Sequence, residues 1–376
     1  QSFKSLLFVV VLLPGLLTLT ACADEEQAGS PQEHPSLSYP VDQPGPYAVG
    51  YRSWEHTYEG LGGVGSRTIR LHVWYPATDA TGDNPTYAKV WEDKYAFSDA
   101  TLAPPDDGQG YPVLVYSHGH QGFAGTSHFL MRAFASHGWV AIAPDHVGNM
   151  LVDFKPPKQT WLFYTRATDI SASLDALETL EPTDPLHGLA KTEKVVMSGH
   201  SFGVHTCWAV AGASYDMAAI EPGCENTGSP MPSGSCTQAE LDVYKTGNRD
   251  PRVVASIPMA GSIDRKMFGT QGHEAVEIPF LSISGGSDKV DAEQQYNSVE
   301  GLDITWIEIA GGCHQSFALG PCGTLSPEEG FPIIETYARA FARRHVLDDS
   351  DPLTLKILDG THTLSAKVNF QQKGSK

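Results

Sequence analysis

The sequence has little positive charge. Its 376 residues include 25 Lys and Arg against 44 Asp and Glu, which gives a formal net charge of −19. Such a chain would be repelled by a nucleic acid, because binding to phosphates depends on Lys and Arg. We therefore expect no nucleic acid among its partners. The excess of acidic side chains is typical of an exported protein that must stay soluble.

Internal repeats, heptads and clusters of Cys and His with zinc-ligand spacing are also missing, which argues against solenoids, coiled coils and structural zinc sites. Long apolar runs are missing as well. The apolar stretch at residues 6–13 is broken by Pro14 and Gly15, and it is too short to span a bilayer.

Residues 1–22 have the pattern of a secretory signal. Lys4 precedes the short apolar stretch, and the tetrapeptide LTAC at 19–22 resembles the bacterial lipobox, in which the cysteine becomes the lipidated first residue. The alternative is a plain signal peptide cut nearby. Residues 23–46 are rich in Glu, Gln, Ser and Pro, which predicts a flexible tether. We expect an exported lipoprotein of the bacterial cell envelope, anchored to the membrane through Cys22.

Export makes disulfides possible. Cys224 and Cys236 flank a part of the chain rich in Gly, Ser and Pro, and Cys313 and Cys322 flank a loop. We predict that each pair closes its own loop, although spacing does not establish the connectivity. Cys207 is then left as a buried thiol.

Apolar strands and amphipathic helices alternate between residues 47 and 346. The runs at 112–117, 139–143, 194–198, 253–257, 280–284 and 304–309 are continuous and apolar or nearly so, and helical patterns occupy 129–137, 165–180 and 328–344. This alternation predicts an α/β fold with a mostly parallel, doubly wound sheet and helices on both faces. The domain carries an insert at 215–248, and we assign no role to the extension at 347–376.

The pentapeptide GHSFG at 199–203 lies between the strand at 194–198 and an apolar helix beginning at Phe202. A Gly-x-Ser-x-Gly in this setting is a nucleophile elbow, in which the chain turns too sharply for any residue but glycine two positions before and after the serine. Ser201 is therefore the candidate nucleophile.

A serine hydroxyl needs a base, and the base needs an acid that orients it. In sheets of this type the order along the chain is Ser, Asp or Glu, then His. His314 directly follows the strand at 304–309 and is the candidate base. Asp288 follows the strand at 280–284 and is the preferred acid, with Asp264 after the strand at 253–257 as the alternative.

An oxyanion hole requires two backbone N–H groups that point at the developing charge. Phe202, next to the nucleophile, should supply one. The loop SHGHQG at 117–122 should supply the other, from His120 or, with a shift of one residue, from Gly119. We interpret His118 as a structural histidine tied to the backbone. The pair Asp145 and His146 precedes Ser201 in the chain, so we expect an architectural or pocket-lining role for it.

At this point the sequence resembles a known family. Six blocks in order are similar to bacterial dienelactone-hydrolase-like proteins, which are related to platelet-activating-factor acetylhydrolases: SHGH at 117–120, APDHVGN at 143–149, GHSFG at 199–203, DPR at 250–252, GGSD at 285–288 and GCH at 312–314. The resemblance covers about residues 46–346. It implies an α/β-hydrolase fold and ester hydrolysis without a metal or organic cofactor. Ser201, Asp288 and His314 match the triad, and His120 and Phe202 match the oxyanion positions.

The stretch 308–317 also looks like that of bacterial cutinase-like polyester hydrolases, which carry the acid where Asp288 lies. Acetylhydrolases carry it after the preceding strand, so the resemblance does not imply narrow phospholipid specificity. Dienelactone hydrolases themselves use cysteine, so Ser201 favours ordinary carboxylic esters. The insert at 215–248 departs from the compact pattern and is expected to form part of a lid or pocket wall.

We therefore predict a monomeric serine esterase that acts on short-chain, lipid-derived or polymeric esters. Two alternatives remain at this stage. One is a peptidase or amidase on the same fold, which lacks support because no carboxylate cluster for amine recognition is evident. The other is a ligand-binding envelope lipoprotein without catalysis, which would have no need of a strained serine.

Overall fold

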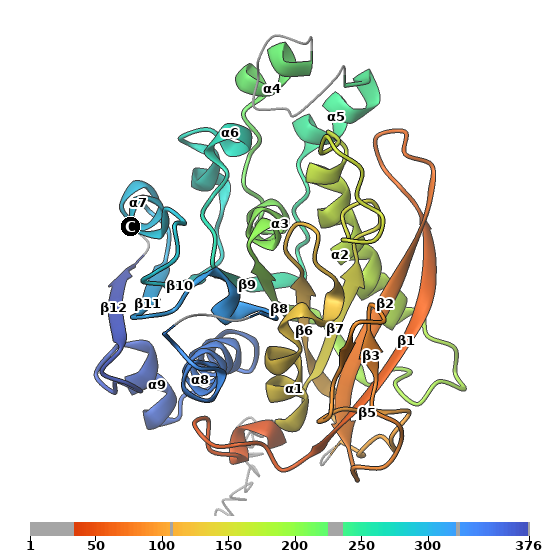
Figure 1. The fold of residues 1–376 in the computed structure, drawn as a ribbon, viewed down its shortest axis with the longest axis vertical. Helices are drawn as coiled ribbons and strands as arrows, with labels where there is room; N and C mark the ends of the chain where they lie inside the picture. The colour runs from red at the N-terminus through yellow and green to blue at the C-terminus, as the bar shows by residue number, and fades with distance from the viewer. Residues whose placement is uncertain (1–33, 106–107, 225–235, 321–323, 375–376) are drawn as a thin grey trace, which may run out of the picture. The chain divides into compact units, whose positions relative to one another are not determined.

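The computed structural model describes residues 34–105, 108–224, 236–320 and 324–374. They form a ten-stranded sheet in the order β12-β11-β10-β9-β8-β6-β7-β2-β1-β5 (Figure 1). The strands are β1 (Ala48–Glu59), β2 (Ser66–Ala77), β5 (Phe97–Ser98), β6 (Tyr111–Ser117), β7 (Val140–Asp145), β8 (Ala190–His200), β9 (Val253–Met259), β10 (Phe280–Gly285), β11 (Ile304–Ile309) and β12 (Val368–Lys373). A two-stranded ribbon pairs β3 (Thr86–Tyr87) with β4 (Trp91–Glu92).

The six central strands, β6 to β11, run parallel, whereas β2 and β12 pair antiparallel at the two sides. Helices cover both faces, with α1 and α8 on one and α2 and α3 on the other (Figure 1). The helices are α1 (His128–Ser136), α2 (Leu162–Glu178), α3 (Phe202–Ala211), α4 (Met217–Cys224), α5 (Gln238–Thr246), α6 (Arg265–Phe268), α7 (Ala292–Ser298), α8 (Pro327–Val346) and α9 (Pro352–Leu358). The predicted α/β fold class is confirmed.

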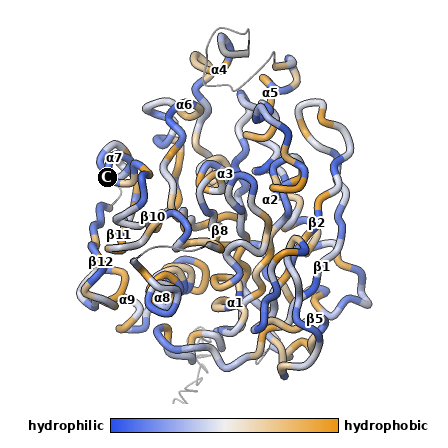
Figure 2. Tube along the Cα trace, in the orientation of Figure 1, coloured by the Kyte–Doolittle hydropathy of each residue, from blue (hydrophilic) through white to orange (hydrophobic). Residues whose placement is uncertain are grey.

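The sheet is apolar on both faces because helices cover both. Every residue of β6 and β7 is buried, and the hydrophobic colours concentrate around β8 and α3 in Figure 2. One core layer lies between the sheet and α2 with α3, and a second lies between the sheet and α1 with α8. The continuous apolar runs in the sequence correspond to these central strands.

The extension at 347–376, which has no role in the sequence analysis, belongs to the domain. Ile357 of α9 is fully buried in the core layer of α8. β12 pairs with β11 along its whole length, from Ile304 opposite Lys373 to Ile309 opposite Val368. The extension therefore covers the edge of the sheet that β11 would otherwise leave unpaired.

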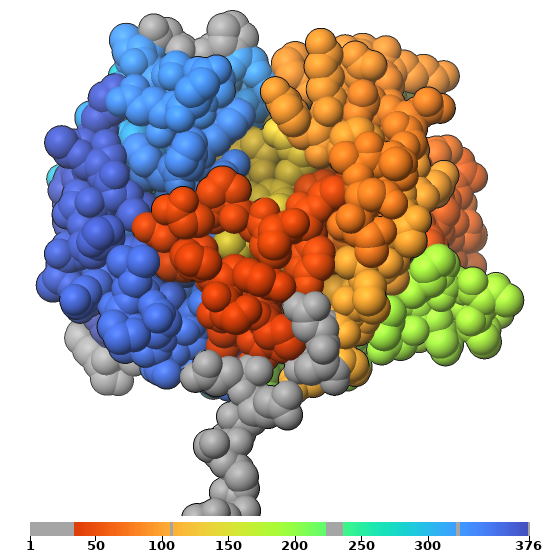
Figure 3. Space-filling model, turned by 90° about the horizontal axis from the view of Figure 1, so that it is seen from below, coloured from red at the N-terminus to blue at the C-terminus, as the bar shows by residue number. Residues whose placement is uncertain are grey.

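The predicted tether at 23–46 is too long. Residues 34–46 pack against the domain, and Figure 3 shows them in red between the segments of the C-terminal part and the remainder of the domain. Two buried arginines of α8 hold them, because Arg339 donates to the carbonyl of Val41 (2.8 Å) and Arg343 to that of Tyr39 (2.7 Å). The packed segment begins at His34, and residues 23–33 lie outside the described part of the chain.

Cys207 is a buried free thiol, as predicted. Cys236 and Cys313 are each disulfide-bonded. Their predicted partners, the Cys224 side chain and Cys322, lie outside what the structure describes, as does Cys22, so both pairings and the lipidation site stay predictions. Among the described residues, no helix is long and apolar enough to cross a membrane.

Candidate active site

Ser201 stands at the turn from β8 into α3, with φ at 55° and ψ at −114°. A non-glycine residue reaches this positive φ only under strain that the surrounding structure imposes. The two flanking glycines allow the turn. A Cβ atom on Gly199 would lie 2.5 Å from the carbonyl oxygen of Gly203, and one on Gly203 would lie 2.1 Å from that of Ser117.

The structure brings Ser201, His314 and Asp288 together in a hydrogen-bonded chain. Ser201 Oγ lies 2.9 Å from His314 Nε2, and His314 Nδ1 lies 2.9 Å from Asp288 Oδ2. A carboxylate can only accept hydrogen bonds, so the proton of a neutral His314 must lie on Nδ1. Nε2 is then free to accept the serine proton. The side chain of Asp288 is 6% exposed and that of His314 is 35% exposed.

Asp288 and His314 are adjacent because their strands are neighbours. β10 and β11 pair in parallel, and both residues follow the carboxyl end of their strand. The two loops are hydrogen-bonded to each other, since the Ser287 amide donates to the Gly312 carbonyl (2.8 Å). Gly285 permits this approach, because a Cβ there would lie 2.3 Å from the same carbonyl oxygen.

His200, the residue before Ser201, holds the other side of the base. Its Nε2 lies 2.9 Å from the His314 carbonyl oxygen, and the two rings are 4.8 Å apart. Burial, followed by the neighbouring His314, lowers the pKa of His200 to about 3. His200 therefore stays neutral at physiological pH and donates through Nε2 to a carbonyl that can only accept.

Three backbone amides near Ser201 have no hydrogen-bond partner in the described part of the chain. Within the described residues, the N–H groups of Phe202, Gly119 and His120 donate to no protein acceptor. The α-carbon of Gly119 points at the nucleophile, because a Cβ there would lie 3.2 Å from Ser201 Cβ. The structure thus brings the predicted oxyanion loop to Ser201 and leaves both alternatives, His120 and Gly119, open.

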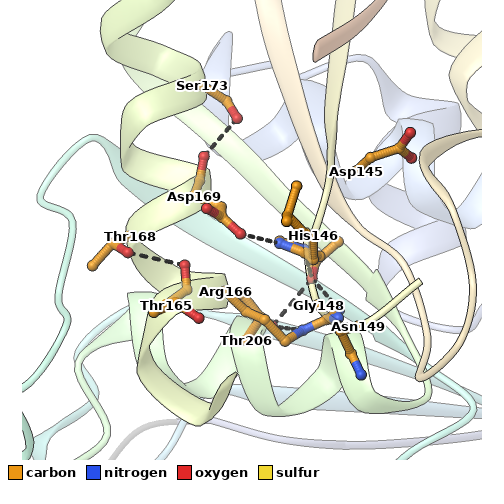
Figure 4. A network of polar contacts seen from close by, with 12 residues as sticks. Asp145, His146, Gly148, Asn149, Thr165, Arg166, Thr168, Asp169, Ser173 and Thr206 are labelled. Carbon is orange, nitrogen blue, oxygen red and sulfur yellow. Dashed lines mark hydrogen bonds and ion pairs between the residues drawn. The ribbon is translucent and has the colours of Figure 1, made fainter. Parts of the chain in front are cut away.

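Arg166 of α2 supports this loop from behind. Its guanidinium donates to Ser117 Oγ (2.8 Å), to the His118 carbonyl and to Asn149 Oδ1 (2.6 Å). The Asn149 amide in turn lies 2.6 Å from His120 Nδ1. Figure 4 shows Arg166 directed at Asn149 and Thr206, which lie on different segments.

His118 and the pair Asp145 and His146 are structural, as the sequence analysis expects. His118 Nε2 accepts from the His146 amide (3.0 Å), and Asp145 lies 3.1 Å from His72. His146 Nδ1 lies 2.8 Å from Asp169 Oδ2 (Figure 4). Burial lowers the pKa of His146 to about 4, so it acts as a neutral bridge between α2 and the sheet.

Asp264, the alternative acid, is not brought to His314. Its carboxylate caps α6 by accepting from the Lys266 amide (3.1 Å), and its other oxygen lies 3.8 Å from His205 Nδ1. It lines a cavity of about 570 Å³ next to Ser201, whose wall is formed by the start of α3, residues 262–266, Thr270 and one side of α7. No described residue of the insert at 215–248 lines this cavity.

Comparison with known proteins bears on the fold. The sequence profile of the chlorophyllase family matches residues 96–221, which is 126 of 376 residues and includes Ser201 but neither Asp288 nor His314. The structure of a ferulic acid esterase from Streptomyces cinnamoneus superposes with a TM-score of 0.57 at 19% sequence identity, over 86% of this chain and 96% of that chain. The chain has the α/β-hydrolase fold. No curated protein sequence matches it significantly.

The comparisons show this fold, and the narrower likeness to dienelactone-hydrolase-like and acetylhydrolase proteins stays a prediction. Among the described residues, no group of three or more His, Cys, Asp or Glu side chains is arranged to hold a metal ion.

Sequence reasoning missed the roles of Arg166, Asn149 and His200. One signal was available for Arg166, because it shares a helix face with the apolar residues Ile170, Leu174 and Leu177 of α2. A charged residue at helical spacing with core residues is buried with them and needs a polar partner. Nothing local indicates that the partners are on the oxyanion loop.

Proposed function

We propose that this α/β hydrolase is a serine carboxylic ester hydrolase. The observation that carries the proposal is the hydrogen-bonded chain from Ser201 through His314 to Asp288, with 2.9 Å at each step, beside unpaired backbone amides. A strained serine costs stability, and a protein that only binds ligands would have no use for it. The esterase among its structural neighbours supports the same reaction class.

The first half-reaction follows from the geometry. Ser201 Oγ attacks the ester carbonyl carbon while His314 Nε2 takes the hydroxyl proton, and the carbonyl electrons move to the oxygen. The amides of Phe202 and His120 donate to this oxyanion. Asp288 stabilises the imidazolium. When the tetrahedral intermediate collapses, the C–O bond to the alcohol breaks, and the leaving alkoxide receives the proton from His314.

The second half-reaction repeats these steps with water. His314 takes a proton from water, the hydroxide attacks the acyl carbon, and the bond to Ser201 Oγ breaks. Ser201 recovers its proton from His314, and the carboxylic acid leaves. We propose short-chain, lipid-derived or polymeric esters as substrates, within the space that the cavity of about 570 Å³ provides.

Hydrolysis of p-nitrophenyl esters from acetate to palmitate tests the proposal, with Ser201→Ala as the control. We expect activity that the variant loses, together with labelling of Ser201 by a serine-directed fluorophosphonate. The chain length of highest kcat/KM then distinguishes a short acyl pocket from an open lipase-like groove. No hydrolysis of any ester and no labelling would exclude catalysis and favour a binding lipoprotein.

We further propose that the enzyme acts at the bacterial cell envelope as a monomer anchored through Cys22. The anchor and the location rest on the sequence pattern of residues 1–22 alone. Metabolic labelling with a palmitate analogue, compared between the full chain and Cys22→Ala, tests it. Labelling that persists in the variant would contradict the anchor.

A further inference from the structure

We propose that Arg166 is a positioning residue for the oxyanion hole: its buried guanidinium holds the loop that carries His120 and places an uncompensated positive charge behind the oxyanion amides. The inference deepens the proposed ester hydrolysis and rests on it. Arg166 lies behind the loop and reaches the reaction through other residues.

Arg166 is fully buried, and all its hydrogen-bond partners are neutral. Besides Ser117, His118 and Asn149, its Nε donates to Thr206 Oγ1 (3.2 Å). Within the described residues, no carboxylate lies within ion-pair distance of the guanidinium. A buried cation without a counter-ion is costly to the fold, so its presence calls for a function.

The nearby carboxylate of Asp169 favours the charge of Arg166 but is shared, because other groups occupy it. Arg67 binds both of its oxygens, with Nε 2.6 Å from Oδ1 and Nη2 2.8 Å from Oδ2. His146 lies 2.8 Å from Oδ2 and Tyr58 donates to Oδ1 (2.6 Å). Asp169 therefore already has one full counter-charge in Arg67, and the charge of Arg166 is left over.

The contacts of Arg166 reach both proposed oxyanion donors. Its guanidinium carbon lies 4.8 Å from the ring centroid of Phe202, the residue whose amide follows the nucleophile. On the other side, Asn149 relays the contact to His120 Nδ1 and accepts from the Gln121 amide through its carbonyl (2.9 Å). The loop from His118 to Gln121 is thus held at three points that depend on Arg166 or its partner.

The two charged groups that act on His120 of this loop, Lys158 and Arg166, are both cations. The Lys158 ammonium lies 3.9 Å from the ring centroid of Phe202, so two cations flank the ring of that residue. Burial, then Lys158 and Arg166, lower the pKa of His120. The positive potential at the oxyanion amides is already present in the free enzyme. It interacts most strongly with the negative oxygen, which exists only in the tetrahedral intermediate.

The test compares Arg166→Met and Arg166→Lys with wild type on p-nitrophenyl acetate. We expect Arg166→Met to lower kcat by about 10- to 100-fold with KM within about twofold, because the lost stabilisation belongs to the transition state. Arg166→Lys keeps the charge and loses the fork of donors, so its kcat should lie between the two. The second-order rate of fluorophosphonate labelling should fall in the same order, because phosphonylation places a negative oxygen in the same hole.

Arg339→Met is the matched control. Arg339 is also buried and also donates to neutral carbonyls, those of Val41 and Gln43, yet it lies on α8 away from the site. Its loss should lower the melting temperature without changing kcat at a temperature where the variant is folded. A merely structural Arg166 would behave in the same way.

Several outcomes would overturn the inference: kcat of Arg166→Met within twofold of wild type, or Arg166→Lys no faster than Arg166→Met. If Arg166→Met does not fold, the test rests on Arg166→Lys. An unchanged kcat of Arg166→Lys would overturn the inference. A kcat of that variant reduced by about threefold or more at constant KM would support it. Failure of the proposed function is distinct, because then wild type itself neither hydrolyses the ester nor reacts with the fluorophosphonate.

Discussion

Ser201 depends on two neighbours that have no side chain. Gly199 and Gly203 touch across the turn, and Gly203 also lies against the Ser117 carbonyl at the start of the oxyanion loop. Glycine at these two positions thus allows Ser201 to adopt a φ of 55° and allows the oxyanion loop to approach it closely. Because this requirement is local, the pentapeptide together with the strand before it and the helix after it was enough to predict the elbow.

Substitution of single residues distinguishes the two candidate acids, Asp288 and Asp264. Asp288→Asn should lower kcat for p-nitrophenyl acetate by about 10⁴-fold with little change in KM, because the amide presents the wrong partner to His314 Nδ1. Asp264→Asn should cost far less, since Asp264 has no hydrogen bond to His314. A larger loss in Asp264→Asn than in Asp288→Asn would show that the acid is assigned wrongly.

Arg166 marks the limit of prediction at the residue scale. Its burial could have been suspected from the apolar residues that share its helix face. Its partners Ser117 and Asn149 come from segments that are 49 and 17 positions away in the chain, and no local pattern specifies such contacts.

At the scale of elements, the site is an assembly of loops at the carboxyl ends of β6, β8, β10 and β11. Parallel pairing puts these ends at one edge of the sheet, so the loops after β10 and β11 lie side by side and exchange a hydrogen bond. The central strands were predictable because burial on both faces makes them continuously apolar. The outer strands β1, next to the short edge strand β5, and β12 were not predicted, because their half-exposed residues mix polar and apolar types.

β12 supports the loop of the catalytic base, which gives a prediction for the C-terminal element. The Ala310 amide, just after β11, donates to the Lys367 carbonyl (2.8 Å). A chain ending at Leu347 loses this bond, the β11–β12 ladder and buried Ile357, so we expect the free energy of unfolding to fall by roughly 3–5 kcal/mol.

Urea unfolding measures this change, and esterase activity should fall with it. A chain that ends at Lys373 keeps the whole ladder and is the control. Equal unfolding free energies for the chains ending at Leu347 and Lys373 would mean that the extension does not stabilise the sheet edge.

At the scale of the whole molecule, burial keeps many histidines neutral. Burial is the largest cause of a pKa lowered to about 4 or about 3 in six residues spread over the domain: His128, His137, His146, His200, His205 and His345. Such groups bind a proton more readily in the unfolded chain, where the pKa of histidine is about 6.5. Above about pH 6.5 these histidines are neutral in both states, so their contribution to the stability of the folded state is fully present there.

The sign of the pH dependence follows. As pH falls from about 6.5 to about 4, these histidines bind protons in the unfolded state but not in the folded state. The free energy of unfolding therefore falls by up to about 1.4 kcal/mol per pH unit for each histidine. Urea unfolding at pH 7.5, 6 and 5 should show this loss.

One variant isolates the effect. His137→Gln keeps a donor for the Gln43 carbonyl and removes one titrating group, so it should flatten the pH dependence. His362→Gln changes an exposed residue and should leave the slope as it is. A stability that does not change between pH 7.5 and 5 would contradict the prediction.

The sequence by itself determined the alternation of helices and strands, the elbow at Ser201 and the order in which nucleophile, acid and base occur. These depend on local spacing and on burial that acts along the chain. Tertiary structure alone decided that Asp288, and not Asp264, meets His314, that residues 34–46 pack on α8, and that Arg166 lies behind the oxyanion loop. Such contacts join segments far apart in sequence, and only the pairing of strands and the packing of helices bring them together.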